Sequence, residues 1–185
     1  ESLMKSLGLS EADQVIVAGS THAGEEEQIA RAYKSVRESL APGPPEGRQA
    51  RAGGQARLIL APRHTVRAAQ AHQAVLACGL QAHNRTEGPA KEGEVIVLDT
   101  MGELARIYGL ADVAFVGGSL VPIGGHDILQ PIAHGVPVFF GPHMHKQRDA
   151  AELAAQAGIG FRIRDADELA RGIAEFLAAP ERSVK

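Results

Sequence analysis

The chain repeats one pattern six times: a short, continuously apolar run is followed by a longer segment whose apolar residues have helical spacing. Strands with such continuous runs are typical of a parallel sheet, because helices bury both of its faces. The alternation therefore predicts an α/β fold, a doubly wound, Rossmann-like parallel sheet of about six strands with helices on both faces. The predicted strands are 15–19, 56–62, 94–100, 111–118, 136–142 and 158–165, and the predicted helices are 25–40, 65–79, 101–109, 126–135, 145–158 and 167–179.

The length of 185 residues suits one domain, and no linker divides the chain into two. Two segments rich in proline, glycine and polar residues, 41–56 and 81–93, are interpreted as solvated loops. The sequence begins at Glu1 rather than at a methionine, and we expect it to be one domain of a longer protein.

Composition argues against several classes of function. The net charge of −3 and the lack of a long basic block give no electrostatic case for nucleic acid as a partner. The single cysteine, Cys78, excludes an intrachain disulfide framework and a cysteine-rich metal site, and the histidines lack metal-site spacing, so we expect no metal. No apolar run approaches 18 residues, which predicts a soluble fragment. Neither GxGxxG after the first strand nor GxxxxGK[ST] is present, so no usual dinucleotide or P-loop site is indicated.

Polar, glycine-rich and histidine-bearing stretches follow most of the predicted strands. In an open parallel sheet, ligands bind beyond the carboxyl ends of the strands. These stretches would converge on that edge, and their clustering predicts a ligand site there. They are 19–22, 62–64, 99–103, 117–119 with 124–127, and 141–143.

Single stretches allow a structural reading as well as a functional one. Ser20 and Thr21 stand at a strand-to-helix turn that could bind an anion, or they could only cap the helix. Thr100 and Glu103 have the spacing of a capping box, which favours a structural role. Arg63 follows a buried strand and could bind a phosphate with two hydrogen bonds, or pair with a surface carboxylate.

The stretch Gly124-Gly125-His126-Asp127 lies between a predicted strand and a predicted helix. Two glycines let the backbone approach a ligand closely, and N–H groups at a helix start attract an anion. On this interpretation His126 donates to a phosphate, and Asp127 and Gln130 reach a ribose or a sugar. A plain tight turn is the alternative.

Five stretches together resemble a known family. In order along the chain they are AGSTHAGEEE (18–27), LILAPRH (58–64), DTMGELARIYGLADVAFVGGSL (99–120), GGHDILQPIAHGVPVFFGPH (124–143) and AAQAGIG (154–160). They resemble the C-terminal half of 3-deoxy-D-manno-octulosonic acid (Kdo) transferases, which add Kdo to lipid A in lipopolysaccharide biosynthesis. The resemblance runs from about Val15 to Leu177. A looser part of the pattern is shared by glycosyltransferases with two Rossmann-like domains, the GT-B type.

The resemblance implies that residues 1–185 form a single nucleotide-sugar-binding domain, the C-terminal half of a two-domain GT-B protein. It implies CMP-Kdo as the donor, with no cofactor and no metal. The donor nucleotide would be bound by Pro62, Arg63, Met101, Gly102, Glu103, Asp127, Ile128, Leu129 and Gln130. The donor phosphate or sugar would lie near Ser20, Thr21, Gly124, Gly125 and His126.

The family's N-terminal half carries the lipid A acceptor site, the membrane attachment and the general base. The resemblance therefore implies no catalytic residue in this fragment, and an isolated domain that binds donor without catalysis. The full-length protein would lie at the cytoplasmic side of the bacterial inner membrane. The implied reaction is direct displacement of CMP by a lipid A hydroxyl, with Arg63 and the N–H groups at the start of the 126–135 helix stabilising the leaving group.

Two departures from the family keep other functions open. The family usually reads GGHNxLEP, whereas this chain has Asp127 and Gln130, and the family's HTFNF is replaced by HMHKQ at 143–147. Gln130 offers one accepting oxygen where a glutamate offers two. One alternative is a UDP-sugar GT-B glycosyltransferase or a nucleotide-sugar epimerase domain. The other is a non-catalytic nucleotide-binding module.

Overall fold

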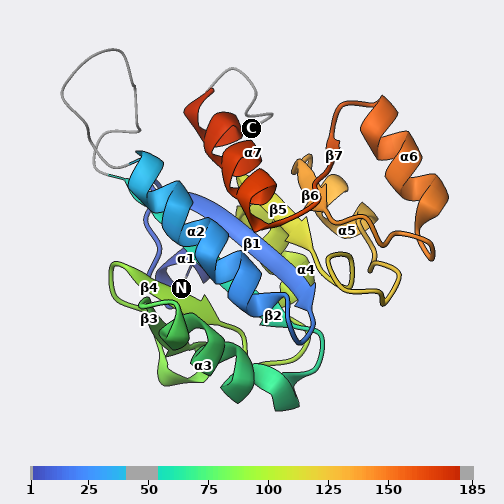
Figure 1. Cartoon of the computed structure of the whole chain (residues 1–185). Coiled ribbons are helices and arrows are strands. Elements are labelled where there is room, and N and C mark those ends of the chain that lie inside the picture. The colour runs from blue at the N-terminus through green and yellow to red at the C-terminus, as the bar shows by residue number, and fades with distance from the viewer. Residues whose placement is uncertain (1, 41–53, 180–185) are drawn as a thin grey trace.

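The structure, a computed structural model, describes residues 2–40 and 54–179 (Figure 1). Seven strands of these ranges form one sheet: β1 (Gln14–Thr21), β2 (Ala56–Pro62), β3 (Gln81–Asn84), β4 (Glu94–Val97), β5 (Val113–Val116), β6 (Val138–Phe140) and β7 (Gly160–Arg162). The α-helices are α1 (Leu3–Ser6), α2 (Glu26–Leu40), α3 (Ala68–Ala77), α4 (Leu104–Ile107), α5 (Leu129–Ile132), α6 (Arg148–Gln156) and α7 (Ala166–Ala178). Short 3₁₀ helices lie at η1 (Thr65–Arg67), η2 (Arg85–Glu87) and η3 (Tyr108–Leu110).

All strand pairs are parallel, in the order β3-β4-β2-β1-β5-β6-β7. Without β3, this is the order 3-2-1-4-5-6 of a doubly wound sheet. The chain winds outwards from β1 to β2 on one side and from β5 to β6 on the other. The carboxyl ends of β1 and β5 therefore form the topological switch point, where ligands bind in such sheets.

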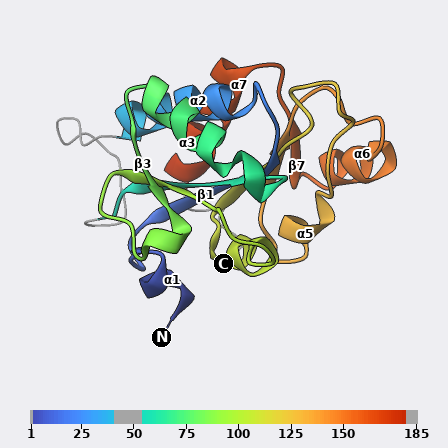
Figure 2. The same cartoon turned by 90° about the horizontal axis from the view of Figure 1, so that it is seen from below.

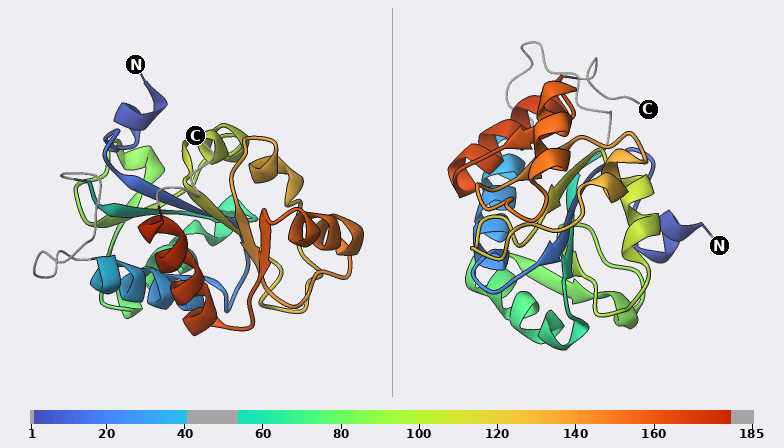
Figure 3. Two further views of the ribbon diagram at one scale, coloured as in Figure 1. Left: turned by 90° about the horizontal axis from the view of Figure 1, so that it is seen from above. Right: turned by 90° about the vertical axis from the view of Figure 1, so that its right-hand side faces the viewer.

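Helices cover both faces of the sheet, as the continuous apolar runs predicted. Figure 2 shows α2, α3 and α7 on one side and α1 and α5 on the other, and Figure 3 shows the sheet between the two layers. Side chains of one strand alternate between the two cores. In β1, Ile16 and Ala18 pack in the core under α2, α3 and α7, whereas Val15 and Val17 pack in the opposite core. Both faces need apolar residues, which confirms the predicted fold class.

The predicted count of about six strands is one short, because β3 lies inside the segment 81–93 that the sequence indicated as a loop. This strand stands at the edge of the sheet and pairs only with β4, where His83 lies opposite Ile96. Its residues, QAHN, are partly or fully exposed and carry no apolar pattern. Of the other predicted loop, 41–56, residues 41–53 lie outside the described residues, and β2 begins at Ala56.

The helices after β4 and β5 are shorter than predicted. In place of one helix over 101–109, α4 covers Leu104–Ile107 and continues into η3. In place of a helix over 126–135, α5 covers only Leu129–Ile132. Pro131 lies in the first turn of α5, where its missing N–H breaks no helical hydrogen bond. Residues 124–128 therefore form a loop rather than the start of a helix.

Gly19, near the end of β1, leaves room for the buried ring of Tyr108. A Cβ atom at position 19 would lie 1.9 Å from the Tyr108 hydroxyl oxygen. We expect Gly19→Ala to lower the free energy of unfolding by about 1–3 kcal/mol, because an overpacked core must shift to admit the methyl group. Urea denaturation measures the change. The control is Gly109→Ala, where the nearest atom is 3.3 Å away on the exposed His134. Equal losses in the two variants would contradict this interpretation.

Candidate functional site

The switch point is built around the buried carboxylate of Glu25, which has no exposed surface. It accepts hydrogen bonds from the backbone N–H groups of Gly118 (2.8 Å), Ser119 (3.0 Å), Leu120 (2.9 Å) and His22 (2.9 Å). One side chain thereby joins the segment after β1 to the loop after β5. Backbone N–H groups can stabilise a buried negative charge, so this carboxylate occupies the anion-binding nest that the two loops form.

Close contact at the switch point requires glycine at position 117. A Cβ atom there would lie 2.4 Å from the carbonyl oxygen of Ser20 and 2.8 Å from the carboxylate of Glu25. Ser20 has a φ of 56°, and the β1–β2 register shifts between Gly19 and Thr21. A serine in the left-handed region stores backbone strain, which is a recurrent feature of functional sites.

Ser20 and Thr21 end a strand and do not cap a helix, because α2 begins only at Glu26. Thr21 is buried, and its hydroxyl donates to the carboxylate of Glu26 (3.2 Å). The same carboxylate binds the guanidinium of Arg67 at 2.6 Å. Thr21 therefore joins the end of β1 to the start of α2 and is not accessible to a ligand. Of the two residues, only Ser20 is partly exposed.

The prediction that N–H groups at Gly124, Gly125 and His126 face an anion is wrong. Gly124 and Gly125 both donate to the carbonyl oxygen of Gly118 (3.1 and 2.8 Å), and His126 donates to that of Gly117 (3.2 Å). Both glycines have positive φ, which lets the chain fold back onto the loop after β5. Their role is to close this loop and to hold the side chain of His126 at the edge of the sheet.

His126 lies against His22, a pairing that links the two sides of the switch point. The Nε2 atoms are 2.7 Å apart, and the rings stack with their centroids 5.0 Å apart. Burial lowers the pKa of His126 to about 4, helped by the neighbouring charges of His22, Arg63 and Lys146. Burial also lowers the pKa of His22, against the opposing effect of Glu25. At neutral pH both rings are therefore neutral, and one donates to the other.

Arg63 provides an uncompensated positive charge at this edge. Its backbone N–H donates to the carbonyl oxygen of Thr21 (2.9 Å), and its side chain is exposed, as is that of His64. Among the residues that the structure describes, no carboxylate pairs with Arg63, so the surface ion pair considered from the sequence is not formed. Pro62 is buried at the end of β2 and shapes the turn rather than offering surface to a ligand.

The stretch after β4 contributes an exposed apolar side chain to the same edge. Met101 is 74% exposed, beside Gly102 with a φ of 82°. Glu103 is directed elsewhere, because its carboxylate contacts the hydroxyl of Thr100 and pairs with Arg85 at 3.4 Å. Glu103 is itself the residue before α4 and has no capping hydrogen bond, so the predicted capping box is not formed.

Residues 127–130 divide between core and surface. Ile128 is fully buried in the core, so its side chain is not available to a ligand as the resemblance implied. Asp127 and Gln130 are exposed, and the Gln130 amide donates to the Asp127 carboxylate at 3.4 Å. The other carboxylate oxygen of Asp127 accepts from the N–H of Leu129 (2.9 Å), and the Leu129 side chain is exposed.

Sequence reasoning missed Glu25 as part of the site, and it placed His22 at the ligand edge within the stretch 19–22 without giving it a role. Glu25 begins a run of three glutamates at the start of a helix, where acidic residues are common for electrostatic reasons alone. The signal that could have identified it is the glycine-rich turn after β5, whose N–H groups need a partner.

No group of three or more His, Cys, Asp and Glu side chains in the described ranges is arranged to hold a metal ion. None of the helices described is long and apolar enough to cross a membrane.

Replacing Glu25 tests whether its carboxylate holds the site together. In Glu25→Gln, an amide NH₂ must face two of the four N–H donors, because each carboxylate oxygen accepts two of them. We expect the free energy of unfolding to fall by about 3 kcal/mol, the cost of leaving buried donors unpaired. Thermal and urea denaturation measure the change. Glu27→Gln, an exposed neighbour on α2, is the control, and similar stability of both variants would argue against this role.

The neutral state of the half-buried His126 makes stability depend on pH. Its folded pKa of about 4 lies below the ordinary value of 6.5. Between these values the unfolded chain binds a proton that the folded chain does not, so stability falls as pH drops from 7 to 4. We expect His126→Gln to lose less unfolding free energy than the wild type between pH 7 and pH 5. Urea denaturation at each pH measures this. The exposed His134→Gln is the control, and parallel profiles for all three proteins would disprove the explanation.

No protein-family model matches. The 3-deoxy-D-manno-octulosonic acid transferase of Aquifex aeolicus is 33% identical over 174 residues, which are 94% of this chain and 45% of that protein. The same enzyme from Bordetella pertussis is 33% identical over 91% of this chain and 38% of its own length. The chain thus spans less than half the length of these relatives.

A solved structure matches over most of both chains. It is the C-terminal CMP-Kdo binding domain of WaaA from Acinetobacter baumannii, with a TM-score of 0.80 and 30% sequence identity. The alignment covers 94% of this chain and 84% of that domain. The chain therefore belongs to the 3-deoxy-D-manno-octulosonic acid transferase family, and its fold is that of the family's C-terminal domain.

Proposed function

We propose that this chain is the donor-binding domain of a glycosyltransferase that transfers Kdo from CMP-Kdo to lipid A. The observation that carries the proposal is the guanidinium of Arg63, which has no partner among the described residues and lies close enough to His126 of the His22–His126 pair for its charge to lower the pKa of His126. A phosphate ester placed there meets a permanent positive charge and one imidazole N–H group, that of the ring which accepts in the histidine pair. The relatives' Kdo transferase activity and the CMP-Kdo bound by the A. baumannii domain support this choice of ligand.

The nucleoside would lie along the edge formed by the segments after β4 and β5. Met101 and Leu129 offer exposed apolar surface to a base. Asp127 and Gln130 offer one carboxylate and one amide in contact with each other. The family usually has the amide at position 127 and the carboxylate at position 130. The exchange keeps both chemical groups, so Asp127 is the acceptor for the ribose hydroxyls in this chain.

The reaction would be a single displacement at the anomeric carbon of Kdo. The oxygen of a lipid A hydroxyl forms a bond to that carbon, its proton passes to a general base, and CMP leaves with the electrons of the broken C–O bond. Arg63 stabilises the negative charge that develops on the leaving phosphate. The N–H groups of Gly124, Gly125 and His126 take no part, because backbone carbonyls already accept from them. The scheme uses no metal and no cofactor.

The remaining parts of the activity belong to the half of the relatives that this chain does not cover. We place the general base, the lipid A site and the membrane attachment there. On this proposal the isolated chain binds donor but does not catalyse transfer, and the full-length protein acts at the cytoplasmic side of the bacterial inner membrane.

Calorimetric titration with CMP, UMP and UDP tests the proposal. We expect CMP to bind more tightly than UMP and UDP, and Arg63→Ala to weaken CMP binding about ten- to hundredfold, the usual effect of losing a charge-assisted hydrogen bond. Arg31→Ala, which removes an exposed arginine of α2, is the control and should leave the affinity unchanged.

Two outcomes would contradict the proposal. A preference for UDP would move the chain to a UDP-sugar glycosyltransferase of the same fold. Absence of binding by a folded sample would instead favour a module that has kept the fold without nucleotide binding.

A further inference from the structure

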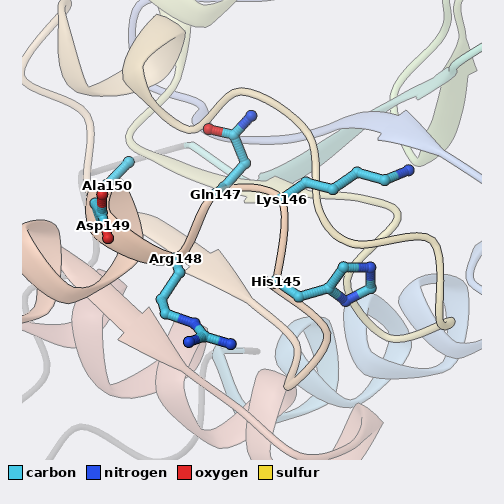
Figure 4. A pocket seen from close by; sticks show the side chains of 6 residues that line it. All are labelled: His145, Lys146, Gln147, Arg148, Asp149 and Ala150. Atoms are coloured by element: carbon cyan, nitrogen blue, oxygen red, sulfur yellow. The ribbon is translucent and has the colours of Figure 1, made fainter.

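A basic pocket lies in the loop between β6 and the start of α6, next to the switch point. Its volume is about 630 Å³, and its lining residues are His145, Lys146, Gln147, Arg148, Asp149 and Ala150. Figure 4 shows His145 and Lys146 extending in the same direction from the loop, whereas Asp149 lies beyond Arg148 on the other side. Two residues with a permanent positive charge, Lys146 and Arg148, therefore line this pocket together with one carboxylate.

The positive charges of the pocket are not used within the protein. The side chains of His145, Lys146 and Arg148 are exposed, and none of them has a hydrogen bond or ion pair to another side chain in the part of the chain that the structure describes. Exposed lysines and arginines without a partner are common on protein surfaces. What distinguishes these is that they line one concave pocket beside the site already described.

The backbone connects the pocket to the His22–His126 pair. The N–H of Lys146 donates to the carbonyl oxygen of Gly124 (3.0 Å). A Cβ atom at Gly124 would lie 2.7 Å from both the His145 ring and the Lys146 side chain, so these side chains pack directly on that glycine. The charge of Lys146 also contributes to the lowered pKa of His126. The pocket and the phosphate site around Arg63 and His126 are thus neighbours in one cationic surface.

The proposed donor carries two negative groups that need neighbouring sites. In a nucleotide-activated 2-ulosonic acid, the anomeric carbon bears both the phosphate ester and the sugar carboxylate. A protein that binds the phosphate at Arg63 and His126 must therefore accommodate a carboxylate close to it. Leaving such a charge without a partner in a partly enclosed site is costly, whereas lysine and arginine pair with it well.

We propose that the pocket formed by His145, Lys146 and Arg148 is the subsite for the carboxylate of the donor sugar. This inference rests on the proposed function and adds to it the residues that select an acidic sugar. Arg148 can bind a carboxylate with two hydrogen bonds, and Lys146 supplies a charge between this group and the phosphate. A nucleotide linked to a neutral sugar would leave these charges uncompensated.

The test compares the affinities for CMP-Kdo and CMP, because only the first carries the sugar carboxylate. Titration calorimetry of the 185-residue chain with CMP and with freshly prepared CMP-Kdo gives the ratio of the two dissociation constants. We expect the Arg148→Ala variant to weaken CMP-Kdo binding at least about tenfold and to leave CMP binding within about twofold. Arg171→Ala, an exposed arginine of α7, should change neither. Thermal melting checks that each variant folds.

Other outcomes overturn the proposal in distinguishable ways. Equal weakening for CMP and CMP-Kdo would place the phosphate rather than the carboxylate in the pocket. No change in the affinity for either ligand would show that the donor does not bind in the pocket, and the subsite would be disproved. If CMP binds to the wild type but CMP-Kdo binds no more tightly, the subsite is disproved while the proposed function stands. If neither ligand binds to the folded wild type, the subsite and the proposed function are both disproved.

Discussion

The buried carboxylate of Glu25 is the interaction on which the functional edge of this domain depends. Parallel strands of a doubly wound sheet diverge at the switch point, and something must hold the two departing segments together. Here one carboxylate accepts four backbone N–H groups, one from the segment after β1 and three from the loop after β5. The positions of His22 and of the glycine loop follow from this contact. The pairing of His22 with His126 also follows from this contact, because the loop after β5 folds back and brings His126 against His22.

This arrangement decides which groups are left to bind a ligand. Many nucleotide-binding folds present free N–H groups at the start of a helix to a phosphate. In this domain the carboxylate of Glu25 takes the N–H groups after β5, and the carbonyls of Gly117 and Gly118 take those of residues 124–126. Positive charge for a bound anion would therefore have to come from side chains, and we propose Arg63 and Lys146 as its source. A chain with a net charge of −3 thus has a cationic functional edge.

Much of the fold followed from the sequence, because strands buried on both faces need continuous apolar runs. β2 begins and ends where it was predicted, and α2 differs by one residue. β3 was missed because an edge strand with polar residues has no such pattern. In the candidate site, the placement of Arg63 and Met101 at the ligand edge was predictable, since both follow buried strands. The burial of Ile128 and the contacts of Glu103 were not, because they depend on neighbours distant in the chain.

The sequence by itself determined the class of fold, the edge of the sheet where a ligand site is expected and the resemblance to Kdo transferases. These depend on local apolar periodicity and on short motifs in a fixed order. Only the tertiary structure decided that Gly124 and Gly125 close a loop, that Glu25 fills the anion nest and that the two histidines stack. The physical reason is that a backbone N–H or a carboxylate looks the same in sequence whether its partner is a ligand or the protein itself. For Glu25 and for the histidine pair, the partners come from segments 93 to 104 residues apart, brought together only by the winding of the sheet.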